Sequence, residues 1–221
     1  SLINDARHYD IGQEKLPSVT TILAATQSSE KRASLAKWKQ KVGENEAERI
    51  KNTAGARGTA MHNYLEHHVE GKGLLDLTDL GVEAKRMAET IIDQGFPDLE
   101  EIWGSECTLY YPGLYAGATD LCGIYQGRES IIDFKQTNKP KRDEWIEDYK
   151  LQMAAYAMAH DYVYDTKIEQ GVILMCTPDC FFQRFIVNGQ DFRNWRKQWL
   201  IRVDQYYEQK SSTKIKSELS N

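Results

Sequence analysis

The sequence predicts an α/β fold in which a central mixed sheet is flanked by helices and preceded by an N-terminal helical appendage. Helical and strand patterns alternate along the second half of the chain, which is typical of α/β proteins. Residues 114–125 and 129–135 have the pattern of two adjacent strands joined by a tight turn. A chain of 221 residues can form one well-buried domain but not two large ones.

The N-terminal region is expected to be mostly helical. Residues 1–27 should form an irregular lead that ends in a short helix after Ser18. Residues 29–69 then carry a charged helical pattern. The glycines at Gly43 and within 55–58 should divide this pattern into two short helices and a third, longer one.

The third of these helices carries His62. His62 and Glu66 share one of its faces, and Gly71 offers it a stop. One further helix should follow before the first strand of the sheet, capped by Asp79 and ended by residues 95–97. The apolar face of this further helix would consist of Leu80, Ala84, Met87, Ala88 and Ile91.

The remaining elements alternate between strands and helices. We expect strands at 105–111, 114–125, 129–135, 169–177 and 181–187. A helix over Asp143–His160 should have one broad face formed by Trp145, Tyr149, Ala154 and Ala157. The last helix should face the core through Phe192, Trp195, Trp199, Val203 and Tyr206.

These patterns divide the chain into three parts. Residues 1–57 form the N-terminal helical region, and residues 58–208 form the α/β core. Residues 209–221 are expected to be a short, polar and frayed tail.

The charge of the chain is moderately acidic. The formal net charge of −5 argues against a protein that coats nucleic acid by bulk electrostatics, because non-specific affinity comes from concentrated Lys and Arg. Basic residues nevertheless gather in residues 31–57, which could be a solvated helix face or a binding surface. No glycine-rich phosphate loop occurs, so a nucleotide-binding metabolic enzyme has no support.

Two acids and a lysine lie on the adjacent strands. They are Asp120 on the first strand and the Asp133-x-Lys135 motif on the second. Carboxylates hold hard divalent cations, and a lysine can position or deprotonate a water, so this set suits metal-dependent phosphodiester cleavage. A strand Asp-x-Lys taken alone is also compatible with a simple ion pair at a strand end.

Other polar residues support the first alternative through their order along the chain. Gln152 and Tyr156 are spaced i,i+4 on one helix, and His62 lies on an earlier helix. Each taken singly could be an ordinary helix residue. The joint order is His62, Asp120, Asp133-x-Lys135, then Gln152-x-x-x-Tyr156.

This order resembles that of the RecB-type branch of the PD-(D/E)XK nuclease superfamily. Within it, the chain looks most like the mitochondrial genome maintenance exonucleases and their phage and bacterial relatives, over roughly residues 9–208. The motifs that carry the resemblance are Leu16–Leu23, Arg57–His62, Tyr115–Asp120 and the helix Trp195–Tyr206. It implies a restriction-endonuclease-like core.

The resemblance also implies roles for individual residues. Asp120 and Asp133 would be metal ligands, with the Phe134 carbonyl often contributing and His62 as an additional ligand. Lys135 would orient or activate the attacking water. Gln152 and Tyr156 would contact the metal site or the DNA backbone. Thr119 replaces the proline of the superfamily name, and Gln136 stands where RecB-like members often have threonine, a hydroxyl that Thr137 could supply instead.

The function expected from this set is a Mg²⁺- or Mn²⁺-dependent DNA exonuclease with one or two ions, acting on single strands in replication, repair or recombination. A flap-type endonuclease with the same core and a catalytically silent nucleic-acid-binding module are the alternatives. Phosphates would meet basic side chains and bases would stack on aromatic rings. The candidate DNA-binding residues are Lys37, Trp38, Lys39, Lys41, Arg57, Lys139, Lys141 and Arg142.

The cysteines and the absence of targeting signals set the expected compartment. Cys107, Cys122, Cys176 and Cys180 lack the spacing of an iron–sulfur cluster in such nucleases, so we expect buried free thiols. No secretory signal or apolar run of spanning length appears. We expect a monomer in the bacterial or phage-infected cytoplasm, or in mitochondria after removal of a transit peptide. Replication or recombination proteins are possible partners. We expect no association with a membrane.

Overall fold

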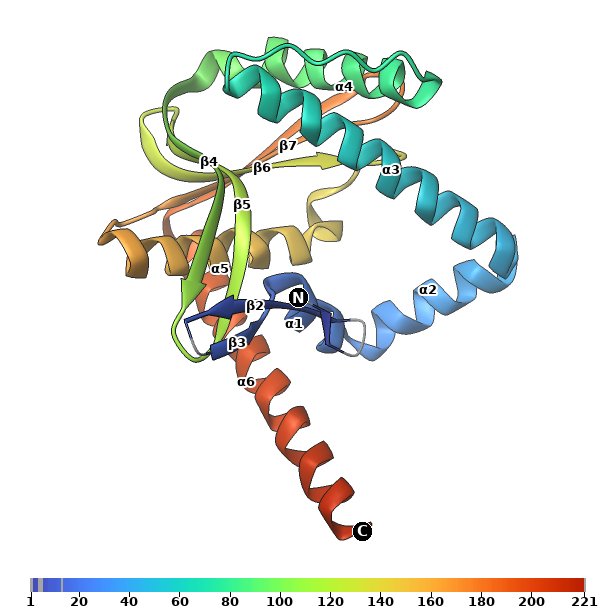
Figure 1. Cartoon of the computed structure of the whole chain (residues 1–221), viewed down its shortest axis with the longest axis vertical. Coiled ribbons are helices and arrows are strands. Elements are labelled where there is room, and N and C mark those ends of the chain that lie inside the picture. The colour runs from blue at the N-terminus through green and yellow to red at the C-terminus, as the bar shows by residue number, and fades with distance from the viewer. Residues whose placement is uncertain (1, 4–5, 13, 221) are drawn as a thin grey trace.

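A five-stranded mixed sheet forms the centre of the computed structural model, which describes residues 2–3, 6–12 and 14–220 (Figure 1). Residues 1, 4, 5, 13 and 221, which belong to the predicted N-terminal region and C-terminal tail, lie outside the described part. The strands, in their spatial order, are β4 (Leu99–Tyr111), β5 (Tyr115–Tyr125), β6 (Arg128–Gln136), β7 (Gln170–Cys176) and β8 (Phe182–Asn188). All five were predicted, β4 being longer than expected.

The strand pairing places β6 in the middle of the sheet. β6 and β7 run parallel, and the other three pairs are antiparallel. A parallel pair needs a crossover connection, which helix α5 (Glu147–Tyr164) provides. The helix starts later than predicted. Trp145 lies in the 3₁₀ turn η2 (Asp143–Trp145) before it and is 60% exposed, so its predicted place on the broad face of this helix was wrong.

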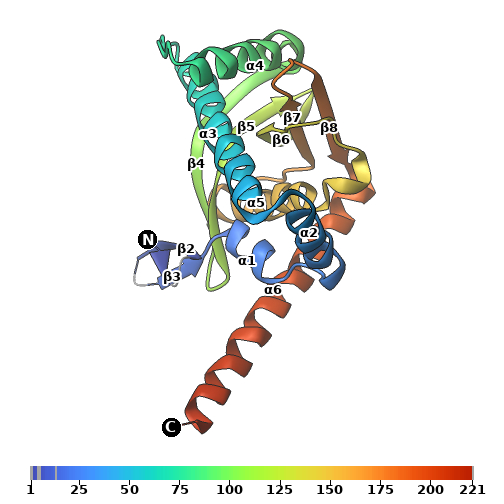
Figure 2. The same ribbon diagram turned by 90° about the vertical axis from the view of Figure 1, so that its right-hand side faces the viewer.

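Helices cover both faces of the sheet, as Figures 1 and 2 show. Along β6, Ile131 packs with one face and Ile132 with the other, as the two-residue period of a strand requires. α1 (Val19–Ala25), α5 and α6 (Gly189–Leu219) cover the face of Ile131. α3 (Glu44–Val69) and α4 (Asp79–Gly95) cover the face of Ile132, with the 3₁₀ turn η1 (Phe96–Asp98) after α4.

The N-terminal lead is not irregular, and this prediction was wrong. β2 (Ala6–Ile11) and β3 (Glu14–Pro17) form an antiparallel pair, and β1 (Leu2–Ile3) adds to β2. These strands are short, and none of them carries an alternating apolar pattern long enough to predict a strand, so they form through pairing with one another. Ser18 then caps α1, which was predicted.

Helix α3 is continuous, contrary to the predicted break at residues 55–58. Glycine in a helix interior costs about 1 kcal/mol relative to alanine, which tertiary packing can offset. Here Met61 and Leu65 are fully buried against α4 and the sheet, and Arg57 forms an ion pair with Glu83 of α4. The break at Gly43 was predicted correctly, since it separates α2 (Ser29–Val42) from α3.

The end of the chain also differs from its prediction. The tail from Gln209 is not frayed: α6 continues through Leu219 and projects away from the body (Figure 2). Its buried residues, from Phe192 to Tyr206, all precede this extension. No helix in the described part of the chain is both long and apolar enough to span a bilayer.

The four cysteines are free thiols, as predicted, but they are not all buried. Cys122 and Cys176 are buried, whereas Cys107 and Cys180 are half-buried. The Sγ atoms of Cys107 and Cys122 lie 3.3 Å apart, because β4 and β5 pair beside each other.

Candidate active site

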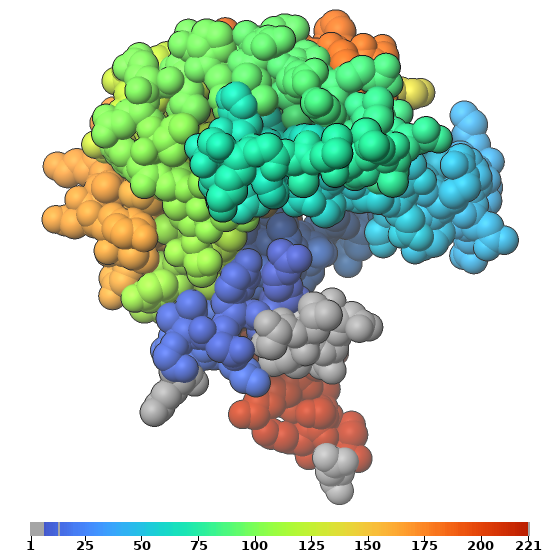
Figure 3. Space-filling model, turned by 45° about the horizontal axis from the view of Figure 1, so that its top comes forward, coloured from blue at the N-terminus to red at the C-terminus, as the bar shows by residue number. Residues whose placement is uncertain are grey.

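A cleft of about 480 Å³ opens between α3, the middle of the sheet and the N-terminal strands. Figure 3 shows this face, where the surface is hollowed between α3, in teal, and the N-terminal segment, in blue. The structure brings together here six of the residues that the sequence singled out. They are His62, Asp120, Asp133, Lys135, Gln152 and Tyr156.

The two aspartates lie where β5 and β6 separate. The ladder between these strands ends at Leu121 and Ile132, one residue short of each aspartate. The Phe134 amide donates to Asp120 Oδ2 at 2.7 Å, so a side chain continues the link between the strands. The Phe134 ring itself is buried on the other face of the sheet, as alternation along a strand requires.

His62 reaches the same point from α3. Its Nε2 lies 3.1 Å from Asp120 Oδ2, and its Nδ1 lies 2.7 Å from the Gly58 carbonyl oxygen one turn earlier. A carbonyl oxygen only accepts, so Nδ1 carries a proton and Nε2 faces the carboxylates. Both ring nitrogens of His62 therefore have partners other than Glu66, the residue that shares its helix face.

Lys135 stands at the centre of a chain of polar contacts. Its Nζ lies 2.7 Å from both Asp133 Oδ2 and Gln152 Oε1, and 4.7 Å from the centre of the Tyr149 ring. Gln152 Nε2 donates to the Tyr156 hydroxyl at 2.9 Å. The ammonium group is thereby held beside Asp133 by contacts on several sides.

The pKa values of His62, Asp120 and Asp133 are shifted because these charged groups lie close together. Burial and the nearby charge of Asp120 raise the pKa of Asp133 to about 7, against the opposing effect of Lys135. Burial alone would lower the pKa of His62, but the hydrogen bond and charge of Asp120 outweigh it and raise this pKa to about 9. Burial likewise opposes ionisation of Asp120, yet His62 holds its pKa well below the usual range.

Glu106 is a further carboxylate of the cleft that the sequence analysis missed. It lies on β4 with φ of 50°, between Ser105 and Cys107, which pair with Leu121 and Thr119 on either side of Asp120. Burial, then the charges of Asp120 and Glu66, raise the pKa of Glu106 to about 7. A lone glutamate in a strand pattern carries no local signal, because only the pairing of β4 with β5 places it here.

The N-terminal strands contribute another wall of the cleft, which was also missed. Arg7 and Tyr9 of β2 line it, together with Ser18 and Thr20 at the start of α1. The only sequence signal for this wall was the Leu16–Leu23 motif.

Gly117 of β5 leaves room in the cleft for Tyr156, because a Cβ there would lie 2.6 Å from the Tyr156 ring.

The donor atoms of the cleft suit a hard divalent cation in their chemistry. The buried carboxylate of Asp133 and the half-buried carboxylate of Asp120 offer oxygen. Because Nδ1 of His62 donates its proton to the Gly58 carbonyl, Nε2, which contacts Asp120 in this structure, is the ring nitrogen that could bind an ion. The residues that would hold the ion are His62, Asp120 and Asp133, with the Phe134 carbonyl. In the described part of the chain no three such side chains are already arranged around one point, since His62 bonds Asp120 and Lys135 bonds Asp133.

A second groove, of about 510 Å³, lies beside the end of β6. Trp38 of α2, Lys139 and Lys141 line it, and so does Tyr149, whose ring lies next to Lys135. Trp38 is 36% exposed, and α2 has no buried residue in the described structure. Of the predicted DNA-binding residues, Trp38, Lys139 and Lys141 share this groove.

The remaining predicted DNA-binding residues lie elsewhere. Lys37, Lys39 and Lys41 are exposed on α2 but do not line the groove. Arg142 lies over the Trp145 ring, and Arg57 is occupied by Glu83 and Asn138. The Thr137 hydroxyl donates to the Lys139 carbonyl at 2.6 Å, so it supplies no contact in the cleft.

Comparisons with known proteins agree with the motifs. The chain is 27% identical over 212 residues to human mitochondrial genome maintenance exonuclease 1, covering 90% of this chain and 60% of that protein. The Xenopus tropicalis protein of the same name is 28% identical over 211 residues, with 88% and 58% covered. The chain resembles these exonucleases. It spans about three fifths of the length of these relatives.

A comparison with solved structures also finds an exonuclease among the similar proteins. A crystal structure of a candidate exonuclease from Eubacterium rectale superposes with a TM-score of 0.50 at 13% identity, covering 69% of this chain and 65% of the other. The chain therefore shares the α/β fold of that structure, with a central mixed sheet flanked by helices, as predicted. A comparison with protein-family models finds no match.

Proposed function

We propose that the protein is a divalent-metal-dependent DNA exonuclease. The observation that carries the proposal is the convergence of His62, Asp120, Asp133 and Lys135 in one cleft, from residues far apart in the sequence. The similarity to the mitochondrial genome maintenance exonucleases, over nine tenths of this chain, supports the same activity.

The side chains of the cleft have different roles in the proposed hydrolysis. Mg²⁺ or Mn²⁺ would neutralise phosphate charge and acidify water there. Lys135 is positioned by Asp133 and Gln152 to orient the attacking water or to stabilise charge on the phosphate. Tyr156 holds the Gln152 amide and so fixes the direction of this chain of contacts.

A single strand is the substrate that we propose, and the groove beside β6 supports this because it combines one exposed indole with two lysines. Trp38 offers a surface on which a base can stack, and Lys139 and Lys141 can contact phosphates. Tyr149 lines this groove and also contacts Lys135 in the cleft. A strand lying in the groove would therefore lead directly to Lys135.

The decisive experiment compares DNA topologies. End-labelled linear single-stranded, linear double-stranded and circular single-stranded DNA are incubated with the protein in Mg²⁺, Mn²⁺ or EDTA. We expect degradation of the linear single strand, little action on the closed circle, and none in EDTA. Cleavage of the circle would favour the flap-type endonuclease, and binding without cleavage in either metal would favour a silent binding module.

The biological setting follows from the same proposal. The relatives are named for maintenance of the mitochondrial genome, which makes DNA replication, repair or recombination the process that we propose. A mitochondrial location is consistent with those names. Fractionation of cells that produce the full-length protein would test it.

A further inference from the structure

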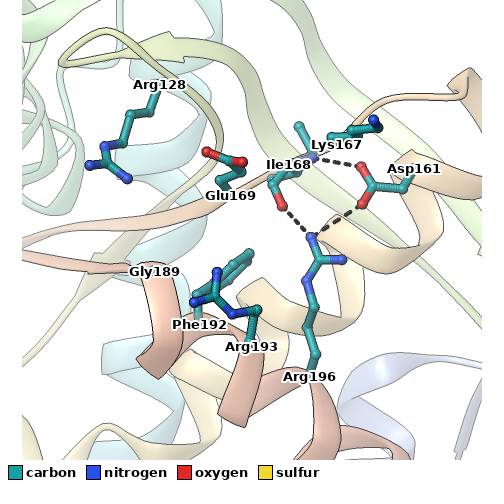
Figure 4. Close-up of a pocket in the computed structure, with 9 residues that line it drawn as sticks. All are labelled: Arg128, Asp161, Lys167, Ile168, Glu169, Gly189, Phe192, Arg193 and Arg196. Atoms are coloured by element: carbon teal, nitrogen blue, oxygen red, sulfur yellow. Dashed lines mark hydrogen bonds and ion pairs between the residues drawn. The ribbon is translucent and has the colours of Figure 1, made fainter.

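A pocket of about 290 Å³ lies at the opposite end of β6 from the candidate active site. It opens between the starts of β6 and β7 and the first turns of α6 (Figure 4). Arg128, at the start of β6, precedes Lys135 by seven residues, which corresponds to about 23 Å along an extended strand. The pocket is therefore separate from the catalytic cleft.

Cationic side chains from three segments meet at this pocket. Arg128 comes from β6, Lys167 from the loop before β7, and Arg193 from α6. Figure 4 shows Arg128 and Arg193 extending toward the same hollow from different elements. Arg128 and Lys167 have no hydrogen-bond or ion-pair partner among the described residues. Arg193 donates only to Gln190 Oε1, a neutral acceptor, at 3.0 and 3.2 Å.

The fourth cation of the pocket is Arg196, whose charge is balanced by an acid and which forms a wall of the pocket. Arg196 pairs with Asp161 at 3.2 Å and donates to the Ile168 carbonyl. Asp161 is held in turn by the Ile168 amide at 2.8 Å and the Thr166 hydroxyl at 2.9 Å. Among the described lining residues, this pair leaves Glu169 as the one acid to set against the three remaining cations, an excess of two positive charges.

An excess of positive charge in a hollow is the arrangement that binds a multiply charged anion. The whole chain carries a net charge of −5, so the excess here is local and not a general property of the surface. Arginine guanidinium groups bind phosphate oxygens through paired, charge-assisted hydrogen bonds. A pocket of this size is at the small end of ligand sites, where compact ligands fit.

We propose that this pocket binds a phosphate group, with Arg128 and Arg193 as its principal ligands and Lys167 at its rim. The group could belong to a free mononucleotide or to a phosphate of a nucleic-acid strand, since both present the same oxygens. The Phe192 ring at the base is 1% exposed, so it closes the pocket and offers no stacking surface. The proposal does not depend on nuclease activity.

The test measures binding by calorimetry in EDTA and at low salt. Inorganic phosphate and a deoxynucleoside 5′-monophosphate are titrated into the wild-type protein and into the double variant Arg128→Gln/Arg193→Gln. We expect the double variant to bind at least about tenfold more weakly. The double variant Lys197→Gln/Lys214→Gln removes the same charge from exposed positions of α6 outside the pocket, and it should bind as the wild type does.

One variant should act in the opposite direction. Glu169→Gln removes the acid that opposes the cations, so it should strengthen phosphate binding, a gain that misfolding would not produce. The proposal is overturned if the arginine variant binds like the wild type, or if its loss equals that of the lysine control. It is also overturned if Lys135→Ala abolishes binding, because the phosphate would then occupy the catalytic cleft.

A second titration separates the two sources of phosphate. A single-stranded oligonucleotide, with and without a 5′-phosphate, competes with the bound mononucleotide in the wild type and in the arginine variant. Competition that depends on Arg128 and Arg193 assigns the pocket to a strand. Mononucleotide binding that the oligonucleotide does not displace assigns it to the free nucleotide.

Discussion

The His62 imidazole lies 3.1 Å from the Asp120 carboxylate, although the two residues are 58 positions apart in the chain. The contact links α3, which covers one face of the sheet, to the point where β5 and β6 separate. It brings an imidazole nitrogen to the cleft that also holds Asp120 and Asp133. The following predictions test what this arrangement does.

Loss of either central group of the cleft should abolish most cleavage. Asp133→Asn and Lys135→Ala should each reduce the rate at least about a hundredfold, because one removes a candidate metal ligand and the other the group that orients water. Single-turnover cleavage of end-labelled DNA measures the loss. Asp204→Asn, an exposed aspartate of α6, is the matched control. Near-normal turnover by either cleft variant, with normal melting, would refute the assignment.

His62 should govern the metal requirement. His62→Ala should raise the Mg²⁺ or Mn²⁺ concentration that gives half-maximal activity, because a nitrogen ligand is lost. His67→Ala is the control, because its Nδ1 makes the same contact to a carbonyl one turn earlier but it lies outside the cleft. Identical metal titrations for the His62 variant and the wild type would leave His62 a structural residue.

The metal-free protein should lose stability as the pH rises. Asp133 and Glu106, with pKa values raised to about 7, and His62, raised to about 9, all bind protons more tightly when folded. The folded state then holds more protons than the unfolded state, so the free energy of unfolding falls from about pH 5 to about pH 9. The pKa of Asp120 is shifted in the opposite direction, so Asp120 changes the free energy of unfolding with pH only in acid, below its ordinary pKa of 3.8.

Divalent metal should reverse this loss. An ion that binds the deprotonated carboxylates stabilises the folded state more as the pH rises. Thermal melting in EDTA and in excess Mn²⁺, at about pH 5, 7 and 9, measures both effects. A melting temperature in EDTA that rises over this range, or a metal effect independent of pH, would contradict the prediction.

The groove beside β6 should carry the single strand. Trp38→Ala should weaken binding by about 1–3 kcal/mol if the indole stacks on a base. The melting temperature should change little, because α2 has no buried residue in the described structure. A large fall in melting temperature with unchanged binding would instead make Trp38 a structural residue.

The position of the lysines separates two paths for the strand. Lys139→Glu/Lys141→Glu should flatten the salt dependence of binding, by about 0.7 of a unit in the log–log slope for each phosphate that the protein no longer neutralises. Lys37→Glu/Lys39→Glu/Lys41→Glu tests the outer surface of α2 in the same assay. Because these three lysines do not line the groove, we expect the smaller change from them. The reverse ranking would place the strand along α2.

The sequence by itself determined the central sheet and the identity of the candidate catalytic residues. Alternating and continuous apolar runs predicted the strands because burial of a strand leaves its two-residue period in the sequence. Asp120, Asp133 and Lys135 could be found because two neighbouring strands place nearby residues side by side. The order of these residues with His62, Gln152 and Tyr156 then pointed to the nuclease resemblance that the comparisons support.

Only the tertiary structure decided the features that depend on distant partners. The N-terminal strands are too short to predict alone, and pairing with each other supplies their hydrogen bonds. The glycines of α3 suggested a break, but packing on α4 outweighs their cost. Glu106 belongs to the cleft through the register of β4 with β5, and Arg128 and Arg193 converge through the fold around α6. Such contacts form between segments far apart in the chain, so no local pattern records them.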